Sequence, residues 1–322
     1  MNSIGLTPAS TNLWTGRAAE TLQYWHQAIK FPDPTNTLSD AKQPAVALLG
    51  YAGDKGVSRN DGRSGAAEGP NAIRKQLGPM AYHLPENLPI WDLGNAGEEG
   101  AEMEAVQDLI TTTVEEILDK HHFPVLLGGG HELAFAHGRG IINHFTKKGE
   151  KVGIINLDAH FDLRPLKDGK GHSGSPFWQL SQLYPRQFQY LCLGIQIPAN
   201  PPTLFATADS LQVEWLPVES FHLLNWDSIN LVIEQFLHEV NKVYLTIDLD
   251  GFASAFAPGV SAPSPMGFAP DIAQQVIKNV AASGKLAAMD VVELNPIYDR
   301  DNSTAKLGAR IIEYALRNKF VK

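Results

Sequence analysis

The stretch Val152-Gly153-Ile154-Ile155-Asn156-Leu157-Asp158-Ala159-His160-Phe161-Asp162 decides the fold of this chain. Its first half is an apolar run, typical of a strand that is buried on both faces of a parallel sheet. Its second half places two carboxylates and an imidazole at two-residue spacing, and in an extended strand such residues share one face. We therefore predict that Asp158, His160 and Asp162 project together from the end of a buried strand, at the crevice where open α/β sheets bind their ligands.

Two further apolar runs end in side chains that bind metals. The run 242–247 leads into Asp248 and Asp250, and the run 123–127 ends in a glycine turn that delivers His131 before a predicted helix. Each motif alone is more often a turn, a helix cap or a satisfied polar group. Together they supply two histidines and four aspartates, and four buried carboxylates need cations because an unpaired buried charge costs several kcal/mol. The combination predicts a binuclear metal site.

The six side chains also restrict the metal. Oxygen-rich sites with some imidazole and no thiolate favour Mn²⁺ or similar hard ions, and Cys192 lies in none of the motifs. Mn²⁺ is the first choice, with Fe²⁺, Co²⁺ and Zn²⁺ as alternatives. Two such ions about 3.5–4 Å apart can share a water molecule and lower its pKa towards neutrality, which makes a nucleophile available. We therefore predict metal-assisted hydrolysis.

Apolar runs that suit buried strands alternate along the chain with patterns that suit amphipathic helices. This alternation predicts an α/β fold, a three-layer α/β/α domain around a doubly wound, mostly parallel sheet. We expect one catalytic domain over residues 44–322, with residues 1–43 as an N-terminal extension that packs on it and contains a weakly amphipathic helix at 14–29. A polar connection at 169–187 is expected to shape a pocket. The strands are predicted at 45–51, 123–127, 152–157, 190–195, 243–248 and 286–293, and the helices at 102–120, 226–240, 271–282 and 304–317.

Composition narrows the class of protein. The 322 residues are 43% hydrophobic and 19% charged, as in ordinary globular proteins. The net charge of −9 argues against nucleic acid or an anionic membrane as partner. No apolar stretch qualifies as a signal peptide or as a membrane span, and a single cysteine excludes an intramolecular disulfide. We therefore expect a cytoplasmic homo-oligomer that acts on a small molecule.

These motifs, in this order, resemble the arginase/agmatinase, or ureohydrolase, superfamily. The resemblance covers roughly residues 44 to 318 and rests on Gly129–Glu132, Asp158–Asp162, Asp248–Gly251 and Glu293–Pro296. Three segments are similar to the formimidoylglutamase branch, namely Asn60–Pro70, Gly128–Glu132 and Asp162–Pro165. Arginases usually read Gly-Asp-His-Ser where this chain reads Gly-Gly-His-Glu. The resemblance implies an arginase-like fold.

The resemblance also implies roles for individual residues. Glu293 matches the glutamate that binds the amidine or guanidine nitrogens, and it follows an apolar run, which again places it at the crevice. Asp162 is expected to take the proton of the attacking hydroxide, and His172 to return it as general acid. The alternative for His172 is an exposed loop histidine. One manganese ion would be bound by His131, Asp158, Asp162 and Asp248, and the other by Asp158, His160, Asp248 and Asp250, with Asp158 and Asp248 bridging.

Arg164 is the expected specificity residue, because a guanidinium fork pairs with a substrate carboxylate. Its alternative is a turn residue paired with a neighbouring acid. Ser173 and Ser175 lie in a loop that resembles the formimidoylglutamase loop, and they are also expected to bind substrate. The implied reaction converts N-formimidoyl-L-glutamate and water into L-glutamate and formamide in histidine degradation. Two alternatives stay open: a guanidino-acid ureohydrolase of the arginase, agmatinase or guanidinobutyrase type, and a non-catalytic metal-binding assembly protein that has lost a ligand or Glu293.

Overall fold

The fold is built on one mostly parallel sheet. The computed structural model describes residues 5–32, 43–97 and 100–321, and the described residues form ten strands. These are β1 (Leu6–Thr7), β2 (Ile29–Lys30), β3 (Val46–Ala52), β4 (Ile90–Gly97), β5 (Phe123–Leu127), β6 (Val152–Leu157), β7 (Tyr190–Ile195), β8 (Glu214–Pro217), β9 (Lys242–Asp248) and β10 (Leu286–Val292). Their order is β1-β4-β3-β5-β10-β9-β6-β7-β8, with β2 also paired to β4. β1 is antiparallel to β4, and the other pairings among the described strands are parallel.

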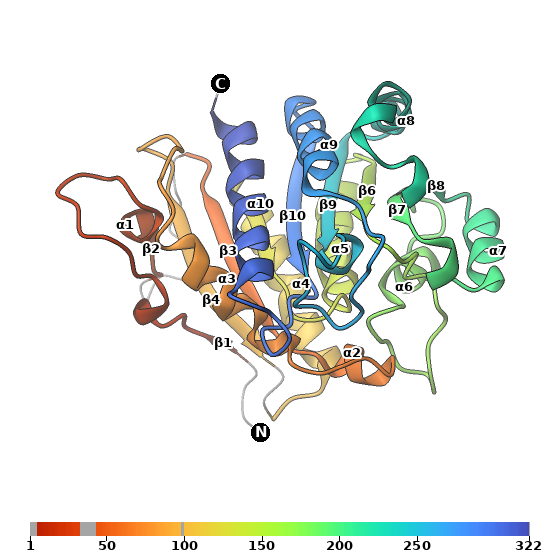
Figure 1. The fold of residues 1–322 in the computed structure, drawn as a ribbon, viewed down its shortest axis with the longest axis horizontal. Helices are drawn as coiled ribbons and strands as arrows, with labels where there is room; N and C mark the ends of the chain where they lie inside the picture. Colours follow the sequence, from red (N-terminus) through yellow and green to blue (C-terminus); the bar gives the residue numbers. More distant parts are fainter. Residues whose placement is uncertain (1–4, 33–42, 98–99, 322) are drawn as a thin grey trace.

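Helices cover both faces of this sheet (Figure 1). Helices α3, α8, α9 and α10 pack on one face, and α4, α5, α6 and α7 on the other, each set around its own hydrophobic core. The predicted three-layer α/β/α fold is therefore confirmed. The helices are α1 (Trp25–Ala28), α2 (Lys55–Arg59), α3 (Gly69–Leu77), α4 (Met103–Asp119), α5 (Leu133–Thr146), α6 (Pro176–Leu183), α7 (Pro202–Ser210), α8 (Trp226–Glu239), α9 (Pro270–Ala282) and α10 (Ser303–Phe320).

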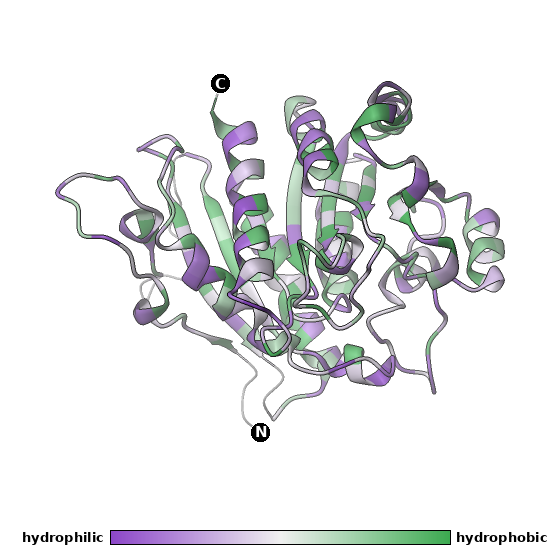
Figure 2. Ribbon diagram, in the orientation of Figure 1, coloured by the Kyte–Doolittle hydropathy of each residue, from purple (hydrophilic) through white to green (hydrophobic). Residues whose placement is uncertain are grey.

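The central strands are apolar on both faces because both faces are covered. In β6, Val152 and Ile154 point into one core, whereas Ile155 and Leu157 point into the other. Full burial of each such side chain contributes roughly 1.5–3 kcal/mol. Figure 2 shows the result, with hydrophobic strands inside and hydrophilic residues on the outer faces of the helices.

Strands β4 and β8 and helix α6 are not among the predicted elements, because their sequences are polar or short. In β4 the polar residue Asp92 is buried, where it forms an ion pair with Arg74 at 2.8 Å and accepts a hydrogen bond from Trp14 Nε1 at 2.8 Å. The edge strand β8 is short and ends in a proline. The connection at 169–187 contains α6, which begins at Pro176 because proline suits the first helical turn.

The N-terminal segment differs from its prediction. The single helix predicted at 14–29 is wrong, because the chain instead forms a 3₁₀ turn at Thr11–Leu13, the short helix α1 and then β2. Trp14 and Trp25 are buried in the same core as α3 and α10, so separate anchors shape this segment. Residues 1–4 and 33–42 of the predicted extension lie outside the described residues.

Strand order positions the functional residues. Strands β5, β10, β9 and β6 are consecutive neighbours, and their carboxyl ends are in register, with Leu127 opposite Val291 and Asp248 opposite Val292. Segments far apart in the chain thereby meet at one edge of the sheet. Within the described part of the chain, no helix combines the length and the apolar character needed to cross a membrane.

Candidate metal centre

All six predicted metal ligands meet at the carboxyl ends of β5, β6 and β9. Two groups form there, and within each group one ligand atom per residue lies within 4.8 Å of the others. Asp158 belongs to both groups, whereas Asp248, which was predicted in both, lies in the first group only, so the predicted ligand sets stay predictions. The first group is His131, Asp158, Asp162 and Asp248, and the second is Asp158, His160 and Asp250.

The prediction that Asp158, His160 and Asp162 share one face of an extended strand is wrong. β6 ends at Leu157, so Asp158, His160 and Asp162 are not residues of an extended strand. Instead, Asp158 Oδ1 accepts a hydrogen bond from the His160 backbone N–H at 2.7 Å, and Asp162 takes a left-handed conformation with φ +51°. Asp248 Oδ1 accepts from Asp250 N at 2.7 Å in the same way. Local side-chain turns, rather than strand alternation, gather these ligands.

His131 is oriented by contacts at both ring nitrogens. Its Nε2 lies 3.0 Å from Thr246 Oγ1, while its Nδ1 faces carboxylate oxygens of Asp162 at 2.9 Å and Asp248 at 3.0 Å. Burial opposes the charged imidazolium, but these carboxylates and that of Asp158 raise the pKa of His131 well above its ordinary value. A metal-binding histidine commonly has such a hydrogen-bond partner behind it, which orients the ring.

The donor set fits hard divalent cations. Burial and neighbouring carboxylates raise the pKa values of Asp162, Asp248 and Asp250, because negative charges crowd together out of water. His131 Nδ1 and Asp250 Oδ1 are buried and form no hydrogen bond with any described residue. Carboxylate oxygens with two imidazoles and no thiolate are the ligands that Mn²⁺ prefers. A bound cation would supply the positive charge and the ligand bonds that these atoms lack.

Removal of bound divalent cations is expected to lower the melting temperature of the protein by several degrees. Repulsion among the buried carboxylates would then be uncompensated, and a ligand present at a hundred times its Kd stabilises by about 2.7 kcal/mol. Scanning calorimetry with and without a chelator measures the shift, which added Mn²⁺ should reverse. Equal melting temperatures in both conditions would contradict metal binding here.

Glu293 lies beside the metal ligands in a constrained conformation. It directly follows β10, its φ is +66°, and its Oε1 accepts a hydrogen bond from the His131 backbone N–H at 2.8 Å. A left-handed conformation costs a side-chain-bearing residue on the order of 1–3 kcal/mol and is often found at functional sites. Burial, followed by the charges of Asp250 and Glu132, raises the pKa of Glu293 well above its ordinary value.

A cavity of ≈ 290 Å³ opens over these ligands. The predicted residues Arg164 and Ser173 line it, together with Glu293 and five of the six metal ligands. Arg164 is exposed, and its side chain lies across the neighbouring loop, where a Cβ on Gly174 would come 3.0 Å from Arg164 Cδ. The predicted specificity residue therefore lies at the wall of the cavity.

His172 and Ser175 do not line this cavity. His172 is only 3% exposed, so the alternative of an exposed loop histidine is wrong. Its Nε2 lies 3.0 Å from the Pro165 carbonyl oxygen, and its Nδ1 accepts from Gly174 N at 3.2 Å. Ser175 Oγ accepts from His172 N and donates to His172 O, both at 2.9 Å. This geometry favours a role in shaping the loop, and the proton-donor and substrate-binding roles of the two residues stay predictions.

Five polar residues that line the cavity were given no role from the sequence. Arg63 Nη2 donates to the Val260 carbonyl oxygen at 2.7 Å, and its guanidinium lies 3.7 Å from the centre of the Tyr298 ring. Asn60 and Arg63 belong to a motif that was noted in the sequence, so a signal existed for them. Asn200 and Ser261 carried none, because the loops that contain them match no ligand motif. The five residues are Asn60, Asp61, Arg63, Asn200 and Ser261.

Comparison with known proteins relates this site to one family. Residues 44–317 match the family model described as the Arginase family. The chain is 41% identical over 316 residues to a formimidoylglutamase of Ralstonia nicotianae, covering 95% of each chain. A formimidoylglutamase structure from Bacillus subtilis has a TM-score of 0.83 at 20% identity, covering 96% of this chain and 95% of that one. A Trypanosoma cruzi formiminoglutamase solved with Mn²⁺ has a TM-score of 0.77 at 24% identity, with coverages of 88% and 96%.

Proposed function

Because this chain belongs to the arginase family, we propose that it is a formimidoylglutamase, which hydrolyses N-formimidoyl-L-glutamate to L-glutamate and formamide in histidine degradation. The observation that carries the proposal is the 41% identity to a formimidoylglutamase over nearly the whole of both chains. The site supports it, since the six predicted ligands and Glu293 are present and lie together. A non-catalytic relative would have been expected to lack one of them.

We propose that the site binds two Mn²⁺ ions per chain. His131, Asp158, Asp162 and Asp248 would bind one ion, and Asp248 would join Asp158, His160 and Asp250 around the other. Bound metal ions would supply a water molecule whose pKa is lowered towards neutrality. The clustered carboxylates and the T. cruzi relative solved with Mn²⁺ support this assignment.

Three side chains at the cavity wall have separate proposed roles in the reaction. Glu293 carries a carboxylate that pairs with the cationic amidine nitrogens, and its hydrogen bond from His131 N aims it at the cavity. Asp162 lines the same cavity and accepts the proton of the attacking water. Arg164 pairs with a carboxylate of the substrate through its guanidinium fork. The leaving amine is protonated as the C–N bond breaks.

The substrate is expected to be decided by Arg164. The wild-type protein should release formamide from N-formimidoyl-L-glutamate and make little urea from arginine or agmatine, because the Arg164 guanidinium repels the cationic tail of agmatine and finds no second carboxylate on arginine. Arg164→Ala should raise KM for N-formimidoyl-L-glutamate by about tenfold or more, the effect of losing a charged hydrogen bond. Steady-state kinetics on a substrate panel measures both.

Lys167→Ala is the matched control for this experiment. Lys167 is an exposed cation of the same segment, pairs with Asp61 at 2.8 Å and does not line the cavity. The Lys167→Ala substitution should leave KM for N-formimidoyl-L-glutamate nearly unchanged. Efficient urea release from arginine, or unchanged kinetics in Arg164→Ala, would instead favour a guanidino-acid hydrolase.

We also propose that residues 44–322 form a single catalytic domain on which residues 1–43 pack, and that the protein is a cytoplasmic homo-oligomer. Burial of Trp14 and Trp25 in the core shared with α3 and α10 supports the packing. Light scattering on the purified protein tests the oligomer.

A further inference from the structure

A second cavity lies at the end of the sheet opposite the metal centre, where β5, β9 and β10 begin. Figure 1 shows the C-terminal end of α10, which borders this cavity, at the top, and α2, near the metal centre, at the bottom. The cavity has a volume of ≈ 600 Å³. Four lysines line it, and Glu150 is the only carboxylate among the described lining residues. The lysines are Lys148 after α5, Lys242 at the start of β9, Lys285 before β10 and Lys319 in the last turn of α10.

Three of these ammonium groups lie near aromatic rings. Lys148 Nζ and Lys242 Nζ lie 5.8 Å and 5.5 Å from the centre of the same Phe145 ring. Lys319 Nζ lies 4.7 Å from the centre of the Phe123 ring and is close enough to Lys242 for the two charges to repel. These contacts hold the lysines in place without neutralising them.

Protein groups satisfy only part of the hydrogen-bonding capacity and charge of these three lysines. Lys319 Nζ donates one hydrogen bond, to the Leu286 carbonyl oxygen at 2.6 Å, and an ammonium has three N–H groups. Lys148 Nζ lies 2.8 Å from His144 Nε2, and His144 in turn pairs with the exposed Asp119 at 2.7 Å. Lys242 alone contacts a carboxylate, that of Glu150 at 3.5 Å. The cluster therefore keeps an excess of positive charge.

Such an excess is costly without a counterion. Burial, together with the charge of Lys242, lowers the pKa of Lys319 to about 8. The chain as a whole has 35 acidic and 26 basic residues, so lysines gathered here do not reflect its composition. Capping of the Leu286 carbonyl accounts for one N–H of Lys319 but not for three lysines that line one cavity. Lys242 and Lys319 are half-buried and Lys148 is exposed, so an anion in the cavity would compensate charge that water solvates only in part.

We propose that this cavity is a binding site for a small phosphate-bearing anion with at least two negative charges, contacted by Lys148, Lys242 and Lys319. The lining cations are lysines and histidines, and no arginine is among the described lining residues. Lysine binds phosphate as a point charge, whereas the planar fork of arginine is suited to two-point recognition of a carboxylate. The site is separate from the proposed catalytic cavity and shares no lining residue with it.

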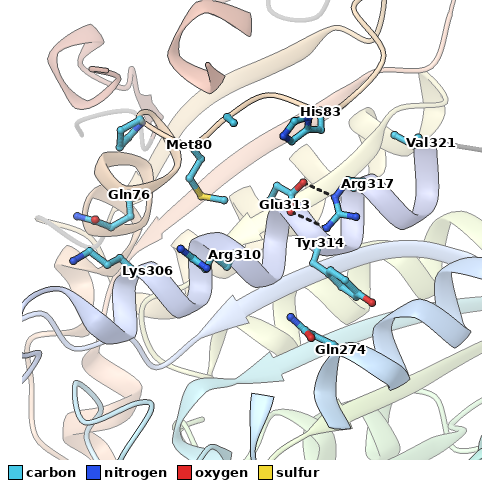
Figure 3. A pocket seen from close by; sticks show the side chains of 12 residues that line it. Gln76, Met80, His83, Gln274, Lys306, Arg310, Glu313, Tyr314, Arg317 and Val321 are labelled. Carbon is cyan, nitrogen blue, oxygen red and sulfur yellow. Dashed lines mark hydrogen bonds and ion pairs between the residues drawn. The ribbon is translucent and has the colours of Figure 1, made fainter. Parts of the chain in front are cut away.

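The outer groove of α10 provides a comparison. Figure 3 shows Lys306, Arg310 and Arg317 along it, with Arg317 paired to Glu313 at 2.8 Å. Lys306 and Arg310 are exposed, so water solvates them already. Exposed charges contribute little to binding because solvent and salt screen them. In the lysine cavity Lys148 is also exposed, but Lys242 and Lys319 are half-buried, so we expect the cavity, through these two lysines, to bind phosphate more strongly than the groove.

Titration calorimetry of the Mn²⁺-loaded protein with inorganic phosphate tests the site. Lys242→Met and Lys319→Met should each weaken phosphate binding by about tenfold or more, since each removes a half-buried charged hydrogen-bond donor. Lys306→Met, in the outer groove, should change the affinity by less than about twofold, as expected for an exposed charge. Succinate, a dicarboxylate, should bind more weakly than phosphate. Hydrolytic activity should be unchanged in all three variants.

Several outcomes would overturn the proposal. Phosphate binding that survives both lysine substitutions but disappears with the metal ions would belong to the metal centre. Binding that Lys306→Met abolishes would belong to the outer groove, and equal affinity for succinate would refute the phosphate class. Lys242 is half-buried at the start of β9, so Lys242→Met decides the test even if Lys319→Met lowers the melting temperature.

Discussion

Asp248→Asn and Asp158→Asn are each expected to remove both metal ions and to abolish hydrolysis of N-formimidoyl-L-glutamate. Asp158 belongs to both ligand groups, whereas Asp248 belongs to the first, with its Oδ2 3.0 Å from His131 Nδ1, and is proposed to reach the second ion as well. A neutral amide bridges two cations poorly, and loss of metal activation removes several kcal/mol of transition-state stabilisation. The rate should therefore fall by at least about a thousandfold, at 1.36 kcal/mol per factor of ten. Elemental analysis and a formamide assay measure the two effects.

Asp290→Asn is the matched control for loss of a buried carboxylate. Asp290 is buried in β10, next to β9, and contacts His137 at 2.7 Å and the Tyr244 hydroxyl rather than the metal ligands. The same assays apply to Asp290→Asn, in which both ions should stay bound. Two ions per wild-type chain with normal metal content in Asp158→Asn and Asp248→Asn would show that neither residue bridges.

Glu293→Gln is expected to lower kcat/KM by about two orders of magnitude or more while leaving the metal content intact. The substitution keeps the shape of the side chain and an oxygen to accept the His131 N–H, but it removes the charge that pairs with the amidine. A lost electrostatic contact of this kind costs ~3 kcal/mol in the transition state. Kinetics, elemental analysis and calorimetry on one preparation separate the possible causes.

The measurements on Glu293→Gln distinguish a residue that contacts the substrate from one that supports the fold or the metal ions. Metal loss in Glu293→Gln would place the residue among the metal ligands or their supports, and a large drop in melting temperature would make it structural. Activity close to that of the wild type would remove it from the site. Each result differs from the expected loss of kcat/KM at constant metal content.

The central strands and the residues that follow them could be predicted from sequence because their signals are local. An apolar run such as 152–157 indicates a strand covered on both faces, and a polar motif at its end indicates a ligand edge. His131, Asp158 and Asp248 follow three such runs, so their meeting required only that the strands be parallel neighbours. The same logic failed for β4, where the polar side chain of Asp92 is stabilised by a distant partner, Arg74.

The tertiary structure alone decided which residues far apart in the chain come into contact. The sequence alone determined the fold class and the candidate ligand residues, because strand burial and ligand type are encoded within a few neighbouring positions. The order of strands places β10 between β5 and β9, so Glu293 meets His131 from 162 positions away, and Arg63 meets Ser261 from 198. The burial of His172 and the lysine cavity at the far end of the sheet arise in the same way. Such pairings leave no periodic pattern in sequence, since each depends on how separate elements pack rather than on the residues beside it.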